Sequence, residues 1–430
     1  MREKITKATA LAVLAGALFI FCGVFCGFAG GYPAGTSVGG VDISGLTYAR
    51  AEKKVRESLR RELSEKQLKI TAGGKKYVFR YPEINVKTNL SSALAAAKKG
   101  GARPLERRYR LVCRESVLRG ICDDFYRKSE NAELIFDASA AEPFTYRTER
   151  SGQFLDGTVL AKAVDKALEG GFEEIKLQPE RVPARITVEK LKRDTCLLSR
   201  FSTKYNASVT GRAKNIAQAA NKLNGTVIAA GAEFSFNRTV GDRTRANGFS
   251  EAPIIFDGDF VSGVGGGVCQ ASTTVYNAAL LAGMGIKEYH PHSLSVGYVE
   301  PSFDAMVSGK NADLRFVNRT GAPVYLVCRA ENGKICAELY GRKSAYSYRR
   351  ESVVTEVISP PEPEYAENEN TKLRAAKDGL KSCGYLLTYK NGVLVGRKRI
   401  RSDSYAPVRG VLAKPEDSAP DGFAARFKIA

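Results

Sequence analysis

Hydrophobic and polar positions alternate with a period of two in two long segments of this chain, residues 68–79 and residues 379–405. Each segment has a glycine-containing turn near its middle, so each predicts a β-hairpin. Elsewhere apolar positions recur with helical spacing, which predicts one helix from about residue 47 to residue 63 and another over residues 157–168. Separate helices and hairpins, without a regular alternation of strand and helix, indicate a multi-domain α+β chain.

A continuous apolar run without a single charge covers residues 8–29, behind a basic start over residues 1–7. About 20 apolar residues suffice to cross a bilayer, and basic residues favour the cytoplasmic side. We therefore expect a cytoplasmic basic end, a single transmembrane signal anchor over residues 8–29, and the bulk of the chain on the cell-wall side of the membrane. A cleaved signal peptide is the alternative, because Gly27-Phe28-Ala29 fits the cleavage pattern.

The chain of 430 residues carries 66 basic and 46 acidic side chains, a formal net charge of +20. No zinc-finger, helix-turn-helix or RNA-binding motif accompanies this charge, so we expect no nucleic-acid partner. Outside the cytoplasm the available polyanions are lipid head groups, teichoic acids and peptidoglycan carboxylates. Peptidoglycan or an anionic wall polymer is therefore the expected partner, and a merely solvated basic surface is the alternative.

Nine cysteines are present, of which two lie in the expected anchor. Cys328 and Cys336 flank a two-residue Asn332-Gly333 turn, which would place Cys336 opposite Arg329 and turn the two sulfurs to opposite faces. We therefore predict no disulfide between them. None of the cysteine spacings fits a zinc site, and we expect neither a metal nor a cofactor.

Two motifs in the first half of the chain point to a known family. The Val-Gly-Gly-Val-Asp-Ile-Ser-Gly-Leu-Thr opening at residues 38–47 and the Gly-x-x-Leu-Asp segment at residues 152–156 make residues 36–190 resemble the YoaR-like peptidoglycan-binding domain of Gram-positive surface proteins. We expect two small α+β lobes there, at about 36–110 and 131–190. Binding to peptidoglycan in the cell envelope is what this resemblance implies.

A second resemblance covers residues 200–341. Phe201-Ser-Thr-Lys-Tyr205, Glu233-Phe-Ser-Phe-Asn237 and the run from Gly265 to Gly283 follow one another in the order and spacing of the VanW family. That family takes its name from an accessory gene of vancomycin-resistance clusters, and the resemblance implies an α+β domain without supplying a reaction.

The last part of the chain resembles a third module. Residues 350–412 are similar to a small glycine-marked β-module that often follows VanW domains and also occurs in wall adhesins. Residues 413–430 are expected to form a tail. The predicted fold class is thus α+β and multi-domain: an N-terminal transmembrane helix, two small α+β lobes, an α+β VanW domain and a small β C-terminal module.

The segment with the clearest chemical character is the triple glycine Gly265-Gly266-Gly267 followed by Cys269 at the start of a predicted helix. Glycines permit positive φ and a close approach of the backbone to a ligand. A helix N-terminus carries partial positive charge, which favours ionisation of a nearby thiol. Other candidate ligand-binding residues surround this segment, namely Gln270, Thr273, Thr274 and Arg243.

The chain has only two histidines, His290 and His292, and both follow the cysteine helix. A helix over residues 270–283 leads about 20 Å away from Cys269 at 1.5 Å per residue, and an extended segment over residues 286–292 returns by about 23 Å. His292 is therefore a candidate base for a Cys269 nucleophile. Asp304 or Asp313 would orient the histidine, and Gln270 or backbone N–H groups near Gly267 would bind an oxyanion.

These observations leave three functions open. The leading hypothesis is a membrane-anchored cell-envelope protein that binds peptidoglycan or an associated wall polymer through its N-terminal and VanW domains. The first alternative is a cysteine-dependent amide hydrolase or transferase that acts on peptidoglycan peptides with Cys269 and His292. The second alternative, an accessory factor in glycopeptide (vancomycin) resistance, rests on the family name alone.

Overall fold

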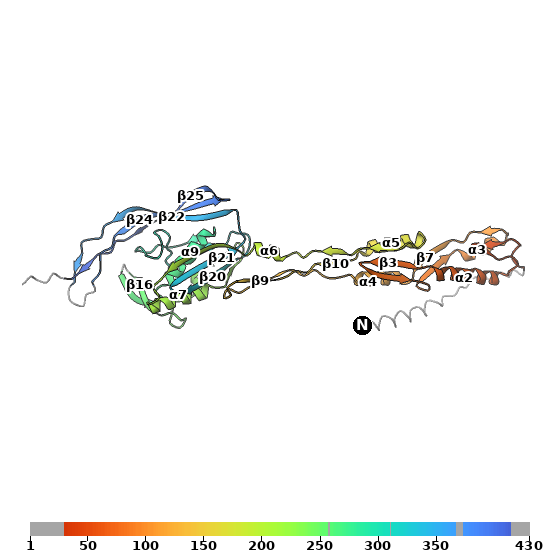
Figure 1. Cartoon of the computed structure of the whole chain (residues 1–430), viewed down its shortest axis with the longest axis horizontal. Helices are drawn as coiled ribbons and strands as arrows, with labels where there is room; N and C mark the ends of the chain where they lie inside the picture. The colour runs from red at the N-terminus through yellow and green to blue at the C-terminus, as the bar shows by residue number, and fades with distance from the viewer. Residues whose placement is uncertain (1–29, 257–258, 310, 367–372, 414–430) are drawn as a thin grey trace, which may run out of the picture. The chain divides into compact units, whose positions relative to one another are not determined.

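The computed structural model describes residues 30–256, 259–309, 311–366 and 373–413, which form many short sheets and packed helices, an α+β fold (Figure 1). Two compact units are present. The first contains the chain up to Ser129 together with Ser151–Pro183, and the second contains Glu130–Arg150 together with the chain from Ala184 onward. Each unit has its own hydrophobic core.

The expected transmembrane helix requires a correction to the predicted fold class. No helix in the described part of the chain is long and apolar enough to cross a membrane. The expected basic end and anchor, residues 1–7 and 8–29, lie outside the described residues, as do residues 414–430 of the expected tail.

One core of the first unit packs two helices against a small sheet. Helix α2 (Tyr48–Glu65) buries Ala51, Val55 and Leu59 at intervals of four residues, so that they form one apolar face against α3 (Leu90–Ala97). The adjoining sheet has the order β2-β1-β6, with strands β1 (Ser37–Val38), β2 (Val41–Asp42) and β6 (Ala102–Arg103).

The second core of this unit joins segments that are distant in sequence. The hairpin of β3 (Leu68–Ala72) and β4 (Lys75–Phe79) is extended by β11 (Ile175–Leu177), which runs parallel to β3. This core therefore combines residues from both expected lobes, about 36–110 and 131–190. The remaining elements are α4 (Arg114–Asp123), α5 (Gly157–Glu169), β5 (Ile84–Thr88) paired with β7 (Arg107–Leu111), and β10 (Gly152–Phe154) paired with β12 (Glu180–Val182).

The centre of the second unit is a four-stranded antiparallel sheet of order β13-β21-β20-β14. Helices α7 (Thr210–Leu223) and α9 (Val268–Leu281) pack on it through one continuous core. Almost every residue of α9 is buried, so this helix is the structural centre of the unit. The strands are β13 (Cys196–Lys204), β14 (Thr226–Ile228), β20 (Val324–Glu331) and β21 (Lys334–Gly341).

Smaller elements surround this sheet. The hairpin β16-β17 precedes α9, and the strand that follows α9 belongs to a three-stranded sheet of order β15-β19-β18. Their bounds are β15 (Glu233–Ser235), β16 (Glu251–Phe256), β17 (Asp259–Val264), β18 (Gly285–Glu288) and β19 (Arg315–Val317). The other elements are β8 (Glu133–Phe136) paired with β9 (Phe144–Arg147), α6 (Val188–Arg193) and α8 (Phe236–Val240).

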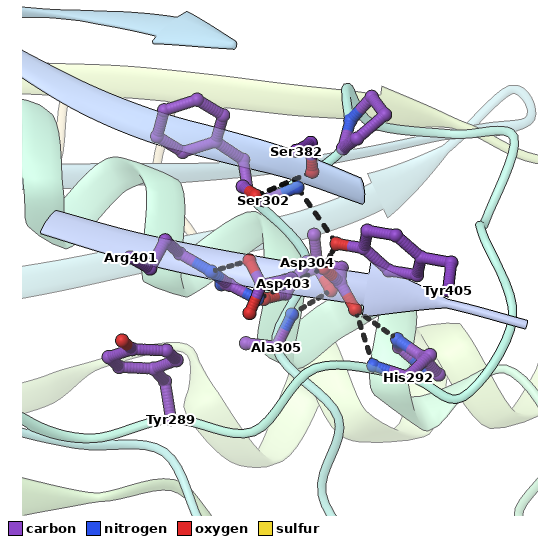
Figure 2. A network of polar contacts seen from close by, with 12 residues as sticks. Tyr289, His292, Ser302, Asp304, Ala305, Ser382, Arg401, Asp403 and Tyr405 are labelled. Atoms are coloured by element: carbon purple, nitrogen blue, oxygen red, sulfur yellow. Dashed lines mark hydrogen bonds and ion pairs between the residues drawn. The ribbon is translucent and has the colours of Figure 1, made fainter. Parts of the chain in front are cut away.

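A long three-stranded antiparallel sheet of order β22-β24-β25 ends the described chain. Its strands are β22 (Tyr346–Ile358), β24 (Gly379–Lys390) and β25 (Val393–Tyr405), and a short parallel pair joins β23 (Glu364–Tyr365) to β26 (Val411–Leu412). Arg401 and Tyr405 of β25 are buried. This sheet therefore contributes side chains to the core around α9, the region drawn in Figure 2.

Both hairpins predicted from alternation are present, as β3-β4 and β24-β25. Cys336 lies opposite Arg329 and Cys328 opposite Ala337, the register that the two-residue turn predicts. All seven cysteines of the described chain are free thiols.

Candidate active site

The triple glycine forms a tight turn that leads into α9. Gly265 and Gly267 have φ values of 91° and 103°, a conformation that side-chain-bearing residues rarely adopt. Gly266 is required for a different reason, because a Cβ atom there would lie 2.5 Å from the carbonyl oxygen of Pro253. Each of the three positions thus depends on the absence of a side chain.

A buried asparagine holds this turn in place. The Asn215 side chain, on α7, donates hydrogen bonds to the carbonyl oxygens of Gly266 at 3.0 Å and Ser250 at 2.9 Å. Its Oδ1 atom accepts from the backbone N–H of Ser250 at 2.7 Å. All of its hydrogen-bonding groups are therefore committed to fixing the glycine turn against strand β16.

Cys269 is the second residue of α9 and is half-buried. Its thiol donates to the carbonyl oxygen of Val307 at 3.4 Å and is hydrogen-bonded to the His292 side chain. Burial opposes the thiolate, yet the hydrogen bond with His292, the charge of His292 and the nearby Arg243 together hold the pKa of Cys269 below its ordinary value.

His292 lies in the loop after β18, between the thiol and a carboxylate. Its Nδ1 atom is 2.7 Å from Oδ2 of Asp304, and its backbone N–H donates to the same oxygen at 2.7 Å. Although burial opposes the charged imidazole, the hydrogen bonds with Asp304 and Cys269 raise the pKa of His292 to about 9. Both shifts favour the pair of a thiolate and an imidazolium over the neutral pair.

Asp304 is itself held by the C-terminal sheet (Figure 2). The Tyr405 hydroxyl donates to its Oδ1 atom at 2.6 Å, and Arg401 Nη1 donates to its carbonyl oxygen at 2.6 Å. Arg401 Nη2 also lies 3.3 Å from Oδ1. Burial raises the pKa of the Asp304 carboxyl group, but these partners and His292 outweigh burial and keep that pKa below its usual value.

The two candidate carboxylates have different surroundings. Asp313 accepts from the Ser235 hydroxyl at 2.6 Å and from the Asn237 backbone N–H at 2.8 Å, at the N-terminus of α8. Asp304 is the one of the two that is hydrogen-bonded to His292. His290, the other histidine, bonds Glu288 at 3.0 Å instead.

The side chains of three remaining candidates form hydrogen bonds with other groups of the protein. The Gln270 side chain donates to Thr203 and to the Lys204 carbonyl oxygen, both at 2.9 Å, and accepts from Arg212, so its amide is fully used. The Thr273 hydroxyl accepts from the backbone N–H of Ala305, and the Thr274 hydroxyl donates to the Gln270 carbonyl oxygen. Neither threonine lines the cavity beside Cys269.

A cavity of about 550 Å³ lies in front of Cys269 and His292. The three glycines, Arg243, Arg212 and Tyr298 contribute to its walls. The backbone N–H of Cys269 is in the first turn of α9, where a helix provides no acceptor, and no acceptor for it is present among the described residues. This N–H is thus available to a negatively charged oxygen next to the sulfur.

Metal binding has no obvious location in the part of the chain that the structure describes. No group of three or more His, Cys, Asp or Glu side chains there is placed to hold an ion. The arrangement suits covalent chemistry at sulfur, in which Cys269 attacks and His292 transfers a proton.

Comparison with known proteins identifies the central part of the second unit. Residues 211–340 match the family model described as VanW like protein. Over 143 residues the chain is 39% identical to "Uncharacterized protein YoaR" of Bacillus subtilis (strain 168). The matched region covers 33% of this chain and 47% of that protein. The chain thus matches about half the length of this curated relative.

One solved structure, titled "IgA1 Protease G5 domain structure", is also similar to part of the chain. It shares 24% sequence identity and covers 15% of this chain and 83% of its own, with a TM-score of 0.12.

Proposed function

We propose that the VanW-like domain over residues 211–340 is a cysteine-dependent amide hydrolase or acyl transferase. The predicted VanW family membership is confirmed, and both similarities fit a cell-envelope protein. The observation that carries the proposal is the hydrogen-bonded series Cys269, His292 and Asp304 beside a cavity. A nucleophile, a base and an orienting carboxylate in this order are the working parts of cysteine and serine acyl-transfer enzymes.

In the first half of the proposed reaction, the Cys269 thiolate attacks the carbonyl carbon of an amide and a C–S bond forms. The carbonyl oxygen becomes an oxyanion next to the free N–H of Cys269. The His292 imidazolium then gives its proton to the departing amine as the C–N bond breaks. The products are a thioester on Cys269, a neutral amine and a neutral imidazole.

In the second half, neutral His292 removes a proton from water or from an acceptor amine, which attacks the thioester carbonyl carbon. The C–S bond breaks, the acid or the new amide leaves, and the thiolate and imidazolium are restored. Asp304 keeps Nδ1 of His292 protonated throughout, so that the other ring nitrogen is the one that exchanges protons with substrate.

The cell envelope contains a suitable substrate class, the amide bonds of peptidoglycan peptides. A test uses the full chain with purified sacculi and mass spectrometry of the released or newly joined peptides. We expect products with the natural chain, none with Cys269→Ala or His292→Ala, and unchanged products with the control Cys336→Ala, whose thiol lies outside the cavity. Equal product formation by Cys269→Ala would contradict the proposal.

A second function, binding of an anionic wall polymer by the first unit, is supported by a different observation. Arg108 and Arg110 of β7 lie on one face of the strand, opposite Lys87 and Asn85 of β5. The three cations are exposed, and none has an ion-pair partner among the described residues. Retention on purified sacculi tests this function, and equal retention of chains with and without residues 36–190 would contradict it.

A further inference from the structure

We propose that the cavity beside Cys269 binds a carboxylate of the substrate, so that the thiol acts on peptides that carry a free carboxylate close to the reacting amide. This inference rests on the proposed function for its chemistry. Its physical basis is the charge of the cavity wall. Apart from the pair of Cys269 and His292, the charged side chains on that wall are Arg212, Arg243 and Lys377, and no Asp or Glu among the described residues lines it.

Of the three cations, Arg243 has the least complete set of hydrogen bonds among the described residues. Its Nε atom is buried and has no hydrogen-bond partner in the described structure. Another nitrogen of the guanidinium bonds the neutral Asn237 amide, and the group lies over the Phe236 ring at 5.9 Å. Burial lowers the pKa of Arg243, and the charges of Cys269, Asp313 and Asp242 offset this effect only in part. A half-buried guanidinium whose side-chain partner is neutral leaves its positive charge available to an anion in the cavity.

Arg212 provides a second positive charge at a fixed position. Its Nη2 atom donates to Oε1 of Gln270 at 2.6 Å. The Gln270 amide is in turn held by Thr203 and Lys204 of β13. The guanidinium is therefore anchored to the sheet by a neutral partner that leaves its charge uncompensated.

Lys377 adds a third charge on the exposed side of the cavity. Its Nζ atom donates to the carbonyl oxygen of Ser295 at 2.9 Å, again a neutral acceptor. Three cations with neutral partners around one cavity produce a positive potential that attracts an anion.

Arg243 also stabilises the Cys269 thiolate. A test must separate that effect from binding of a carboxylate. Iodoacetate and iodoacetamide attack the same thiolate and have similar size, but only iodoacetate carries a carboxylate. The ratio of their alkylation rates at Cys269 therefore cancels the thiolate population and reports recognition of the carboxylate.

We expect the iodoacetate-to-iodoacetamide rate ratio at Cys269 to exceed that of the exposed Cys113 of the same chain by about tenfold, the effect of one hydrogen bond to a charged group. Arg243→Gln and Arg212→Gln should each lower this ratio several-fold. Arg238→Gln, which removes the same charge from an exposed position outside the cavity, should leave it unchanged. Site-resolved mass spectrometry of the full chain measures all of these rates.

An equal ratio at Cys269 and Cys113, or a ratio that survives both cavity variants, would overturn the inference. Denaturant unfolding checks that each variant still folds, and Arg212→Gln provides a second variant if Arg243→Gln does not fold. A clear preference for iodoacetate without any amide chemistry would contradict the proposed function and leave the carboxylate site intact. Amide chemistry without a preference for iodoacetate would support the proposed function and contradict the carboxylate site.

Discussion

At the scale of single residues, His292 determines the charge state of the site. Its imidazole bonds a thiol whose pKa is lowered and a carboxylate whose pKa is lowered, while its own pKa is raised to about 9. Each of the three groups therefore favours its charged form in the folded protein. The same arrangement makes the chemistry depend on pH in a definite direction.

We expect the amide chemistry of Cys269 to follow a bell-shaped pH profile. On the acid side the rate falls as the thiolate is protonated, at a pH below the ordinary thiol pKa because that pKa is lowered. On the alkaline side it falls as His292 loses its proton near pH 9, since the departing amine then receives no proton. Initial rates across the pH range measure the profile.

The His292→Ala variant provides the matching test with iodoacetamide. Without the imidazolium, burial acts on the thiol with less opposition, so the pKa of Cys269 should rise and its labelling at neutral pH should slow at least about tenfold, a shift of one pKa unit or more. The exposed Cys113 serves as the internal control. Unchanged labelling of Cys269 would show that His292 does not ionise the thiol.

The glycine turn allows a steric prediction. Gly266→Ala would force a Cβ atom against the carbonyl oxygens of Pro253 and Ala252, so we expect a loss of about 1–3 kcal/mol in the free energy of unfolding. Gly297→Ala is the matched control, because it also lines the cavity and its Cβ would meet open space. Denaturant unfolding measures both, and equal effects would contradict the steric explanation.

At the scale of elements, strand β25 supports the site from the far end of the chain. Arg401 and Tyr405 lie 97 and 101 residues after Asp304, yet both bond it directly. The Tyr405 hydroxyl also accepts from the backbone N–H of Ser302 at 2.8 Å. A single phenol oxygen thus connects the loop that carries Asp304 to the C-terminal sheet.

Tyr405→Phe removes this connection with little change in shape. We expect the unfolding free energy to fall by about 1–3 kcal/mol, because the Ser302 N–H and Asp304 Oδ1 lose a buried partner. Labelling of Cys269 should then require a higher pH, since a less well held Asp304 supports the imidazolium less. Tyr365→Phe, at a half-exposed side chain of β23, is the control. A fall in stability without any change in the labelling profile would limit Tyr405 to a structural role.

The elements were largely predictable, because alternation and turn residues act locally. Helix α9, with Cys269 in its first turn, and the hairpin of β24 and β25 both follow from their own sequence. The returning segment was predicted as a strand through His292, whereas β18 ends at Glu288 and His292 lies in the following loop, after Pro291. The loop still brings His292 back to the thiol.

The partners of the site were less predictable, because they depend on packing between distant segments. Asp304 and Asp313 were equivalent candidates from the sequence. The structure separates them because Asp313 bonds the start of α8 while Asp304 faces His292. Nothing in the sequence around Arg401 and Tyr405 indicates that they contact Asp304. Asn215 has the pattern of an ordinary polar residue in an amphipathic helix.

At the scale of the whole molecule, wall binding and thiol chemistry are proposed for different compact units. The cations Lys87, Arg108 and Arg110 belong to the first unit, and Cys269 belongs to the second. Substitutions in one unit should therefore leave the function of the other unchanged, as expected for independent cores.

A variant with Lys87, Arg108 and Arg110 all changed to Gln tests this separation. We expect weaker retention on purified sacculi, with a smaller dependence on salt, because fewer charges interact with the polymer. Labelling of Cys269 by iodoacetamide should be unchanged. Retention equal to that of the natural chain would show that this face does not bind the polymer.

The position of Arg401 and Tyr405 near the end of the chain also has a consequence for synthesis. Ribosomes make Cys269, His292 and Asp304 well before the strand that holds Asp304 in place. A nascent or truncated chain that stops after Gly341 therefore contains Cys269, His292 and Asp304 but lacks the hydrogen-bond partners of Asp304 on β25. On the proposed role of Tyr405, Cys269 therefore reaches its full reactivity only after β25 has been made and has folded.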